Sequence, residues 1–309
     1  MGTFIIAVKT VLPLFLIIIT GTLFSRTKAS NANWVDVLNK YALYIGFPAL
    51  VIASLMHLEL GEQSFFTLIV YNSGYIILCS LLAFPVAKLF KFPPQMRRTL
   101  FLILPFGNIA YLGMPVLQNA FGDNILPVAA IISAIYIFWL LTLGIILVEV
   151  NGNESFDVKK LLLSLAQNPL LLSVIVGLVL VFFKIKLPEV AEQTIQLFAN
   201  SVTAVVLFSL GIFLGMQKFG KLKEWYQVAA FVGVTMLVLP FVFYQFLKLT
   251  QFDTQFLKAS VIDAAMPLGL TPYALSLHYK LETTLAARIV VLGTLLSIVI
   301  IPLWMVWLG

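Results

Sequence analysis

Long apolar segments separated by short polar connections dominate the chain. A helix needs about 20 predominantly apolar residues to cross the hydrocarbon core of a bilayer. Ten segments come close to this length, so the pattern predicts an all-α membrane protein with ten transmembrane helices. The predicted spans, in chain order, are 4–24, 35–57, 65–90, 97–121, 125–148, 160–183, 189–214, 224–248, 255–279 and 284–308.

Two of these spans contain helix-breaking residues near their centres. Residues 101–122 read FLILPFGNIAYLGMPVLQNAFG, and residues 260–279 read SVIDAAMPLGLTPYALSLHY. A proline inside a helix costs about 3 kcal/mol, because it removes an N–H group and its ring clashes with the preceding turn. In lipid every freed backbone group must find a partner. Two broken helices therefore predict a cavity near the membrane midplane where an ion or substrate binds, as in secondary transporters.

The two halves of the chain carry matching patterns. A proline and a glycine eight residues later recur in the first and sixth spans, and Pro115 falls on Pro272 at a similar offset. The sequence therefore predicts one repeat over 1–148, a cytoplasmic linker over 149–159 and a second repeat over 160–309. Because each half has five helices, an odd number, the second repeat is expected to be inverted in the membrane.

Composition agrees with a membrane protein, since 61% of the residues are hydrophobic and only 10% are charged. A soluble domain carries about 25% charged residues. The net charge of +6 does not indicate a nucleic-acid partner, because the basic residues are scattered between apolar runs. Their distribution is a topology signal instead.

Fourteen of the nineteen lysines and arginines lie in connections on one side of the predicted membrane, and five lie on the other. The side with more positive charge faces the cytoplasm. The count therefore predicts a multi-pass protein of the cell membrane with both termini outside and a cytoplasmic central linker.

Asp263 is the most informative charged residue. It lies about nine residues into the ninth span, roughly 13 Å from its end. An ionisable group at this depth is costly and is a functional hypothesis by default. Burial favours the uncharged form of a carboxyl group, so Asp263 is a candidate for carrying H⁺, and it can also ligate Na⁺ beside unwound carbonyl groups. The alternative is a structural hydrogen bond to the opened backbone.

Asn108 is predicted to lie two helical turns before Pro115 on the same face. Its amide offers hydrogen-bond donors without a net charge, which suits a carboxylate held by helix N-termini. An interhelical hydrogen bond is the structural alternative. Gly107, Gly113 and Gly269 permit close approach or unwinding near the breaks.

Other polar side chains in the spans have structural alternatives. Tyr111 and Tyr273 are expected either to line the cavity or to pack as core aromatics. Four amides are expected to stabilise helix packing, namely those of Gln118, Asn119, Asn168 and Asn200.

The sequence lacks the motifs of an enzyme. It contains no Cys/His cluster for zinc and no glycine-rich Lys-Ser/Thr loop for ATP. We therefore expect neither catalysis nor a cofactor, apart from H⁺ or Na⁺ as a coupling ion.

At the two breaks the chain resembles the auxin efflux carrier family, which includes plant PIN auxin exporters and bacterial malate and malonate permeases. NIAYLGMP is similar to the family pattern Asn-Thr-Leu-Val-Met-Gly-Ile-Pro, and AMPLGLTPY is similar to Ala-Leu-Pro-Gln-Gly-Ile-Val-Pro-Phe. The residues kept at the family's spacing are Asn108, Gly113, Pro115, Pro267, Gly269 and Pro272.

The resemblance implies a fold like that of bile acid symporters, with two inverted five-helix repeats, a scaffold domain and a transport domain. It also implies that the crossing helices 4 and 9 bind an organic anion, and that access alternates by an elevator-type motion. The serine that follows the helix 2 proline by three residues in PIN proteins is Val51 here, which argues against auxin as the natural substrate.

The sequence therefore predicts a secondary transporter of a mono- or dicarboxylate such as malate, malonate or an auxin-like acid. A cation/proton antiporter is the alternative within transport, and a non-transporting sensor or scaffold is the alternative outside it. The expected partners are the carboxylate and the lipid bilayer, and a monomer and a homodimer both remain open.

Overall fold

The computed structural model describes residues 2–56, 65–152, 157–217 and 225–309. Over these residues the chain is helical and contains no strand. Seven helices are long and apolar enough to cross a membrane. Their apolar parts are Ala7–Phe24, Asn33–Met56, Phe65–Leu89, Asp123–Val150, Glu189–Met216, Trp225–Lys248 and Thr283–Leu308. The chain is therefore an all-α membrane protein.

The other three predicted spans, 97–121, 160–183 and 255–279, are each interrupted helices. In the second of them the interruption is made by Asn168, whose side chain accepts hydrogen bonds from the N–H groups of Leu170 and Leu171 at 3.1 Å each. Asn168 thus caps a new helix that starts at Pro169. The total of ten membrane-spanning segments remains a prediction.

The chain packs as two compact units, and each unit combines segments from both halves of the sequence. Unit 1 contains Met1–Gln63, Ala110–Ala134 and Ala166–Lys218, and unit 2 contains Ser64–Ile109, Ile135–Leu165 and Phe219–Gly309. The compact units are defined by packing, whereas the predicted repeats, 1–148 and 160–309, are consecutive in the sequence. The repeat boundaries therefore stay a prediction. Residues 153–156 of the predicted linker lie outside the described residues.

Unit 1 is built from helices in three separate segments of the chain. Its elements are α1 (Gly2–Phe24), α2 (Ala32–Tyr41), the π-helix η1 (Ala42–Gly46), α3 (Phe47–Met56), most of the π-helix η2 (Ile109–Gly113), α6 (Met114–Phe121), the 3₁₀-helix η3 (Asp123–Ile125), the first part of α7 (Leu126–Trp139), α10 (Pro169–Phe182) and α11 (Glu189–Met216).

Unit 2 begins with a long helix and ends with another. Its elements are α4 (Phe65–Leu89), α5 (Pro94–Ile103), the end of α7, the π-helix η4 (Leu140–Gly144), α8 (Ile145–Val150), α9 (Val158–Ala166), α12 (Trp225–Gly233), the π-helix η6 (Val234–Val238), α13 (Leu239–Lys248), α14 (Thr254–Ala264), α15 (Leu270–His278) and α16 (Thr283–Leu308).

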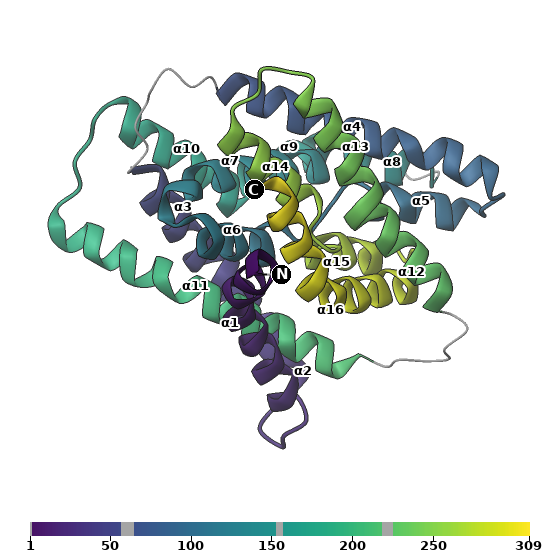
Figure 1. The fold of residues 1–309 in the computed structure, drawn as a ribbon, viewed down its shortest axis with the longest axis horizontal. Helices are drawn as coiled ribbons and strands as arrows, with labels where there is room; N and C mark the ends of the chain where they lie inside the picture. Colours follow the sequence, from purple (N-terminus) through teal and green to yellow (C-terminus); the bar gives the residue numbers. More distant parts are fainter. Residues whose placement is uncertain (1, 57–64, 153–156, 218–224) are drawn as a thin grey trace. The chain divides into compact units, whose positions relative to one another are not determined.

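Within unit 1, α1 and α11 lie side by side and approach closely (Figure 1). A Cβ atom on Gly211 would overlap the carbonyl oxygen of Ile18, and one on Gly21 would overlap that of Phe208. The hydroxyl of Thr22 donates to the Gly211 carbonyl at 3.0 Å. Small residues at the contact let the two backbones approach closely. In a bilayer the hydrophobic effect does not drive helices together, so such close packing stabilises their association.

Three π-helical turns precede prolines in the membrane helices. Pro48, Pro115 and Pro240 each stand two residues after the end of η1, η2 or η6. In two cases the bond that closes the turn skips five residues, from the Phe47 N–H to the Ala42 carbonyl and from the Leu239 N–H to the Val234 carbonyl. A proline inside a helix needs space for its ring and lacks an N–H group. The wider π turn provides this space without breaking the helix.

Polar side chains fasten the ends of several unit 2 helices together. The Arg98 side chain donates to the Val148 carbonyl at 2.9 Å, and the Tyr279 hydroxyl donates to a Glu149 carboxylate oxygen at 2.7 Å. The Glu282 N–H donates to the Thr99 hydroxyl at 3.1 Å. These bonds join α5 to α8, α15 to α8 and the start of α16 to α5, so the two interrupted helices of unit 2 share one support.

The α1–α11 contact generates a stability prediction. Replacing Gly211 with alanine should lower the stability of the purified protein by about 1–3 kcal/mol, because the methyl group has no space beside the Ile18 carbonyl. The measurement is thermal unfolding in detergent. Gly233→Ala is the matched control, because a Cβ atom there meets nothing within 4 Å. Equal melting temperatures for the two variants would contradict the packing described for α1 and α11.

Candidate functional site

Unit 2 contains two helix interruptions that lie against each other. The first covers residues 104–108, with the sequence LPFGN, between α5 and η2. The second covers residues 265–269, with the sequence AMPLG, between α14 and α15. Both contain a proline followed two residues later by a glycine, so the same local chemistry ends the helix in both halves of the chain.

The first interruption lies before Pro115, with which we had aligned the break, whereas the second contains the predicted Pro267 and Gly269. Pro115 is the second residue of α6, and Pro272 is the third residue of α15. Pro272 is tolerated because it stands in a first helical turn, where N–H groups lack an intrahelical partner. Pro115 is tolerated because the π turn η2 before it gives its ring space. The prediction that Asn108 lies on a helical face two turns before Pro115 is therefore wrong, because Asn108 lies in the non-helical interruption itself.

The two interruptions satisfy each other's backbone groups. The Asn108 N–H donates to the Pro267 carbonyl at 2.6 Å, and the Gly269 N–H donates to the Phe106 carbonyl at 3.3 Å. These bonds form an isolated antiparallel bridge centred on Gly107 and Leu268. A membrane interior offers no water to unpaired backbone, so this bridge lets both helices stop at depth.

Two glycines make this close approach possible, as the sequence predicted. A Cβ atom on Gly107 would lie 3.1 Å from the Met266 carbonyl oxygen, and one on Gly269 would lie 2.8 Å from the Gly107 carbonyl oxygen. Gly293 of α16 provides further space, since a Cβ atom there would lie 2.8 Å from the Cβ atom of Pro267. The bridge is thus enclosed by backbone on several sides.

The side chain of Asn108 is buried at the bridge, with 2% of the residue exposed. Among the described residues its Nδ2 atom has no hydrogen-bond partner. A buried amide without a partner costs free energy that a bound ligand can recover. Because the backbone of Asn108 is fixed by the bond to Pro267, its amide is held in place for such a ligand.

Asp263 is fully buried in the last turn of α14, directly before the second interruption. Neither of its carboxyl oxygens has a hydrogen-bond partner within the described part of the chain. The C-terminal end of a helix carries partial negative charge, which further disfavours a charged carboxylate there. An isolated buried carboxylate is unfavourable, so Asp263 requires a proton or a cation. Carboxylate, amide and carbonyl oxygens at one place suit a hard cation.

Two further buried polar groups belong to this region, and the sequence analysis missed both. The Tyr136 hydroxyl has no partner among the described residues and is close enough to Asp263 to interact with its charge. The Thr294 hydroxyl follows Gly293, which packs on Pro267, and it also lacks a partner there. Tyr136 and Thr294 each lie within a long apolar segment. The presence of a polar group in such a segment was the available sequence signal.

A third missed residue is Asn72 in the middle of α4. Its Nδ2 atom donates to the Ser260 hydroxyl at 2.9 Å, and Ser260 lies one turn before Asp263 on α14. Asn72 is completely buried. Its position in a long apolar span was the available signal.

The remaining predicted site residues are divided between the units. Pro272 and Tyr273 stand in the first turn of α15 in unit 2. Tyr111, Gly113 and Pro115 belong to unit 1. The Tyr111 ring packs edge-on against Phe47 there, with ring centroids 5.2 Å apart, so it has the contacts of a core aromatic.

The four amides expected to stabilise helix packing all have partners. Asn119 of α6 donates to the Thr10 carbonyl of α1, which is an interhelical bond. Gln118 donates to Asp123 at 2.9 Å, and Asn200 accepts from Gln196 at 2.9 Å. Asn108 differs from these four amides because, among the described residues, its nitrogen is buried and has no partner.

Comparison with known proteins identifies membrane transporters as relatives of this chain. An uncharacterized transporter of Methanocaldococcus jannaschii is 24% identical over 97% of this chain and 98% of its own length. The "Putative malonate transporter" of Rhizobium meliloti is 20% identical over 93% of this chain and 91% of its own. Auxin efflux carrier component 6 of Arabidopsis thaliana is 27% identical over 47% of this chain and 26% of its own.

The sequence pattern of the family described as "Membrane transport protein" matches residues 6–305, almost the whole chain. The long apolar helices, the paired interruptions and the relatives agree with this match. The chain therefore belongs to this membrane transport family, the auxin efflux carrier family, and is a multi-pass membrane transporter.

Proposed function

We propose that the chain is a secondary active transporter of a small organic anion, a mono- or dicarboxylate. The observation that carries the proposal is the backbone bridge of unit 2. Beside it lie a buried amide nitrogen and a buried carboxyl group that have no hydrogen-bond partner in the described part of the chain. An amide suits the anion, and a buried carboxyl group suits a coupling ion.

The anion binds at Asn108 and at the N-terminus of α15. Leu270 and Thr271 are the first two residues of α15, where N–H groups have no partner inside a helix. The N-terminal end of the helix dipole also attracts negative charge. Pro267, Gly269 and Pro272 fix this end in position, and Tyr273 stands in the same helical turn.

Asp263 couples transport to an ion. A charged Asp263 repels a carboxylate bound at the same bridge, whereas a proton or Na⁺ at Asp263 removes that repulsion. Ion and substrate then favour each other's binding, and the coupling is reciprocal. Tyr136 lies within electrostatic range of Asp263, and its buried hydroxyl has no hydrogen-bond partner among the described residues.

Alternating access proceeds by an elevator-type motion in which one compact unit moves as a rigid body. The division of the chain into two units, each built from both halves of the sequence, supports this proposal. Tyr111, Gly113 and Pro115 belong to unit 1, and their predicted role in substrate binding stays a prediction.

The name of the Rhizobium meliloti relative makes malonate the first substrate to test. The distribution of lysine and arginine supports the cell membrane, with both termini outside and the central linker in the cytoplasm. A homodimer remains part of the hypothesis because the membrane faces offer many exposed apolar side chains.

Flux into proteoliposomes tests the function directly. Labelled malonate, malate and indole-3-acetate should be compared under imposed pH and Na⁺ gradients. We expect uphill accumulation of at least one carboxylate under one gradient. Ion exchange without carboxylate flux would instead establish a cation/proton antiporter, and the absence of any flux would favour a sensor or scaffold.

Replacing Asn108 with alanine should weaken carboxylate binding by about 1–3 kcal/mol, roughly 5- to 150-fold, because a hydrogen bond to a charged group is lost. The backbone bond to Pro267 remains, so the melting temperature should change little. Equilibrium binding to purified protein is the measurement. Asn200→Ala is the control, since its bond to Gln196 is local to α11. Equal affinities for the two variants would show that Asn108 has a structural role and does not bind the carboxylate.

Replacing Asp263 with asparagine should abolish ion-driven accumulation while exchange of carboxylate across the membrane continues, because the side chain is then permanently uncharged. Accumulation and exchange are measured separately under pH and Na⁺ gradients. Asp253→Asn is the matched control on the same helix, because an asparagine there still caps α14 through the bonds to Gln255 and Phe256. Normal accumulation by the Asp263 variant under both gradients would show that Asp263 is structural.

A further inference from the structure

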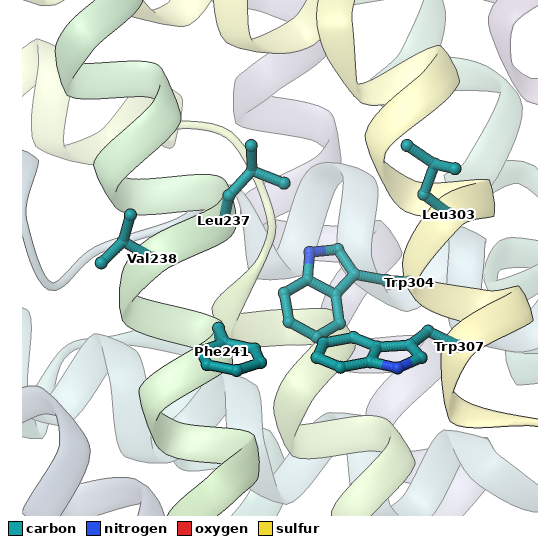
Figure 2. Close-up of a pocket in the computed structure, with 6 residues that line it drawn as sticks. All are labelled: Leu237, Val238, Phe241, Leu303, Trp304 and Trp307. Atoms are coloured by element: carbon teal, nitrogen blue, oxygen red, sulfur yellow. The ribbon is translucent and has the colours of Figure 1, made fainter.

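Unit 2 carries an apolar groove that is lined by none of the bridge residues (Figure 2). The groove has a volume of about 530 Å³ and is lined by Leu237, Val238, Phe241, Leu303, Trp304 and Trp307. This volume lies within the range of about 300–1,000 Å³ found for small-molecule sites. The lining side chains come from η6 and α13 on one side and from α16 on the other.

The walls of the groove are aliphatic side chains and aromatic rings, and its surface is almost entirely apolar. The rings of Phe241 and Trp307 stack with centroids 5.3 Å apart and an interplanar angle of 4°. The indole N–H of Trp304 points away from an occupant, since it donates to the Met236 carbonyl at 2.9 Å. The part of a ligand that occupies the groove must therefore be hydrocarbon.

A positive charge stands at one end of the same surface. The Tyr244 ring contacts Trp307, with centroids 5.0 Å apart, and the Lys248 ammonium lies 5.4 Å from the centre of the Tyr244 ring. Phe241, Tyr244 and Lys248 follow each other at helical spacing, so they share one face of α13 over about 10 Å. Along this face the side chains change from the apolar ring of Phe241 to the phenol of Tyr244 and then to the ammonium group of Lys248.

This order matches the order of chemical groups in a membrane lipid. Tryptophan and tyrosine rings gather at the membrane–water interface, and a lysine near a helix end reaches the level of the headgroups. Lys248 is the last residue of α13 and is exposed. Hydrocarbon in the groove and an anionic headgroup at Lys248 thus complement the surface in both polarity and charge.

We propose that this groove is a binding site for one anionic phospholipid, with an acyl chain between α13 and α16 and its phosphate at Lys248. The lipid is a structural ligand distinct from the transported anion. The site joins α16, which packs on the bridge through Gly293, to α13. Occupancy at the groove therefore affects a helix that supports the proposed transport site.

Native mass spectrometry of delipidated protein tests the proposal. The probes are dioleoyl phosphatidylglycerol and dioleoyl phosphatidylcholine, which have identical chains and differ in headgroup charge. We expect one phosphatidylglycerol molecule to bind more tightly than phosphatidylcholine. Lys248→Gln should reduce phosphatidylglycerol affinity about fivefold and leave phosphatidylcholine unchanged, since one lysine is lost near the phosphate. Trp307→Ala should weaken both lipids.

Matched controls come from unit 1. Lys186→Gln removes an exposed lysine, and Phe183→Ala removes an exposed ring that stacks only edge-on with Phe182. Neither control should change lipid affinity. Equal affinity of the wild type for both lipids, or unchanged binding in both groove variants, would overturn the proposal. A change from dimer to monomer in Trp307→Ala without loss of lipid would also overturn it, because the groove would then be an interface between copies.

Discussion

The structure of unit 2 depends on the pairing of backbone groups where two helices stop inside a membrane protein. An unpaired N–H or carbonyl group in lipid costs several kcal/mol. Here Asn108 bonds to Pro267 and Gly269 bonds to Phe106, so each interruption supplies partners for the other. The two breaks are therefore stable only together, and Gly107 and Gly269 are the residues that let them meet.

This pairing explains why polar side chains are tolerated at the same place. The bridge uses backbone groups alone, which leaves the amide of Asn108 and the carboxyl group of Asp263 without partners in the described structure. A protein that only needed stability would replace such groups with apolar ones at little cost. Their presence beside the N-terminus of α15 is the physical reason for assigning transport chemistry to this bridge.

The sequence predicted the helical class, the existence of both breaks and the roles of Asn108 and Asp263 as polar groups at depth. It misplaced the first break, because Pro115 has the same composition signal as Pro105, whereas the second break contains the predicted Pro267 and Gly269. It missed Tyr136, because the electrostatic proximity of Tyr136 to Asp263 arises from tertiary packing between segments distant in sequence. Periodicity cannot report such contacts, nor can it show that each compact unit draws on both halves of the chain.

The most direct test of the account is an experimental structure of the protein with a transported carboxylate bound. The account predicts the carboxylate within hydrogen-bonding distance of the Asn108 amide and of the first N–H groups of α15, with the bonds from Asn108 to Pro267 and from Gly269 to Phe106 intact. A carboxylate bound away from residues 106–108 and 267–273, or a structure in which those two backbone bonds are absent, would contradict it.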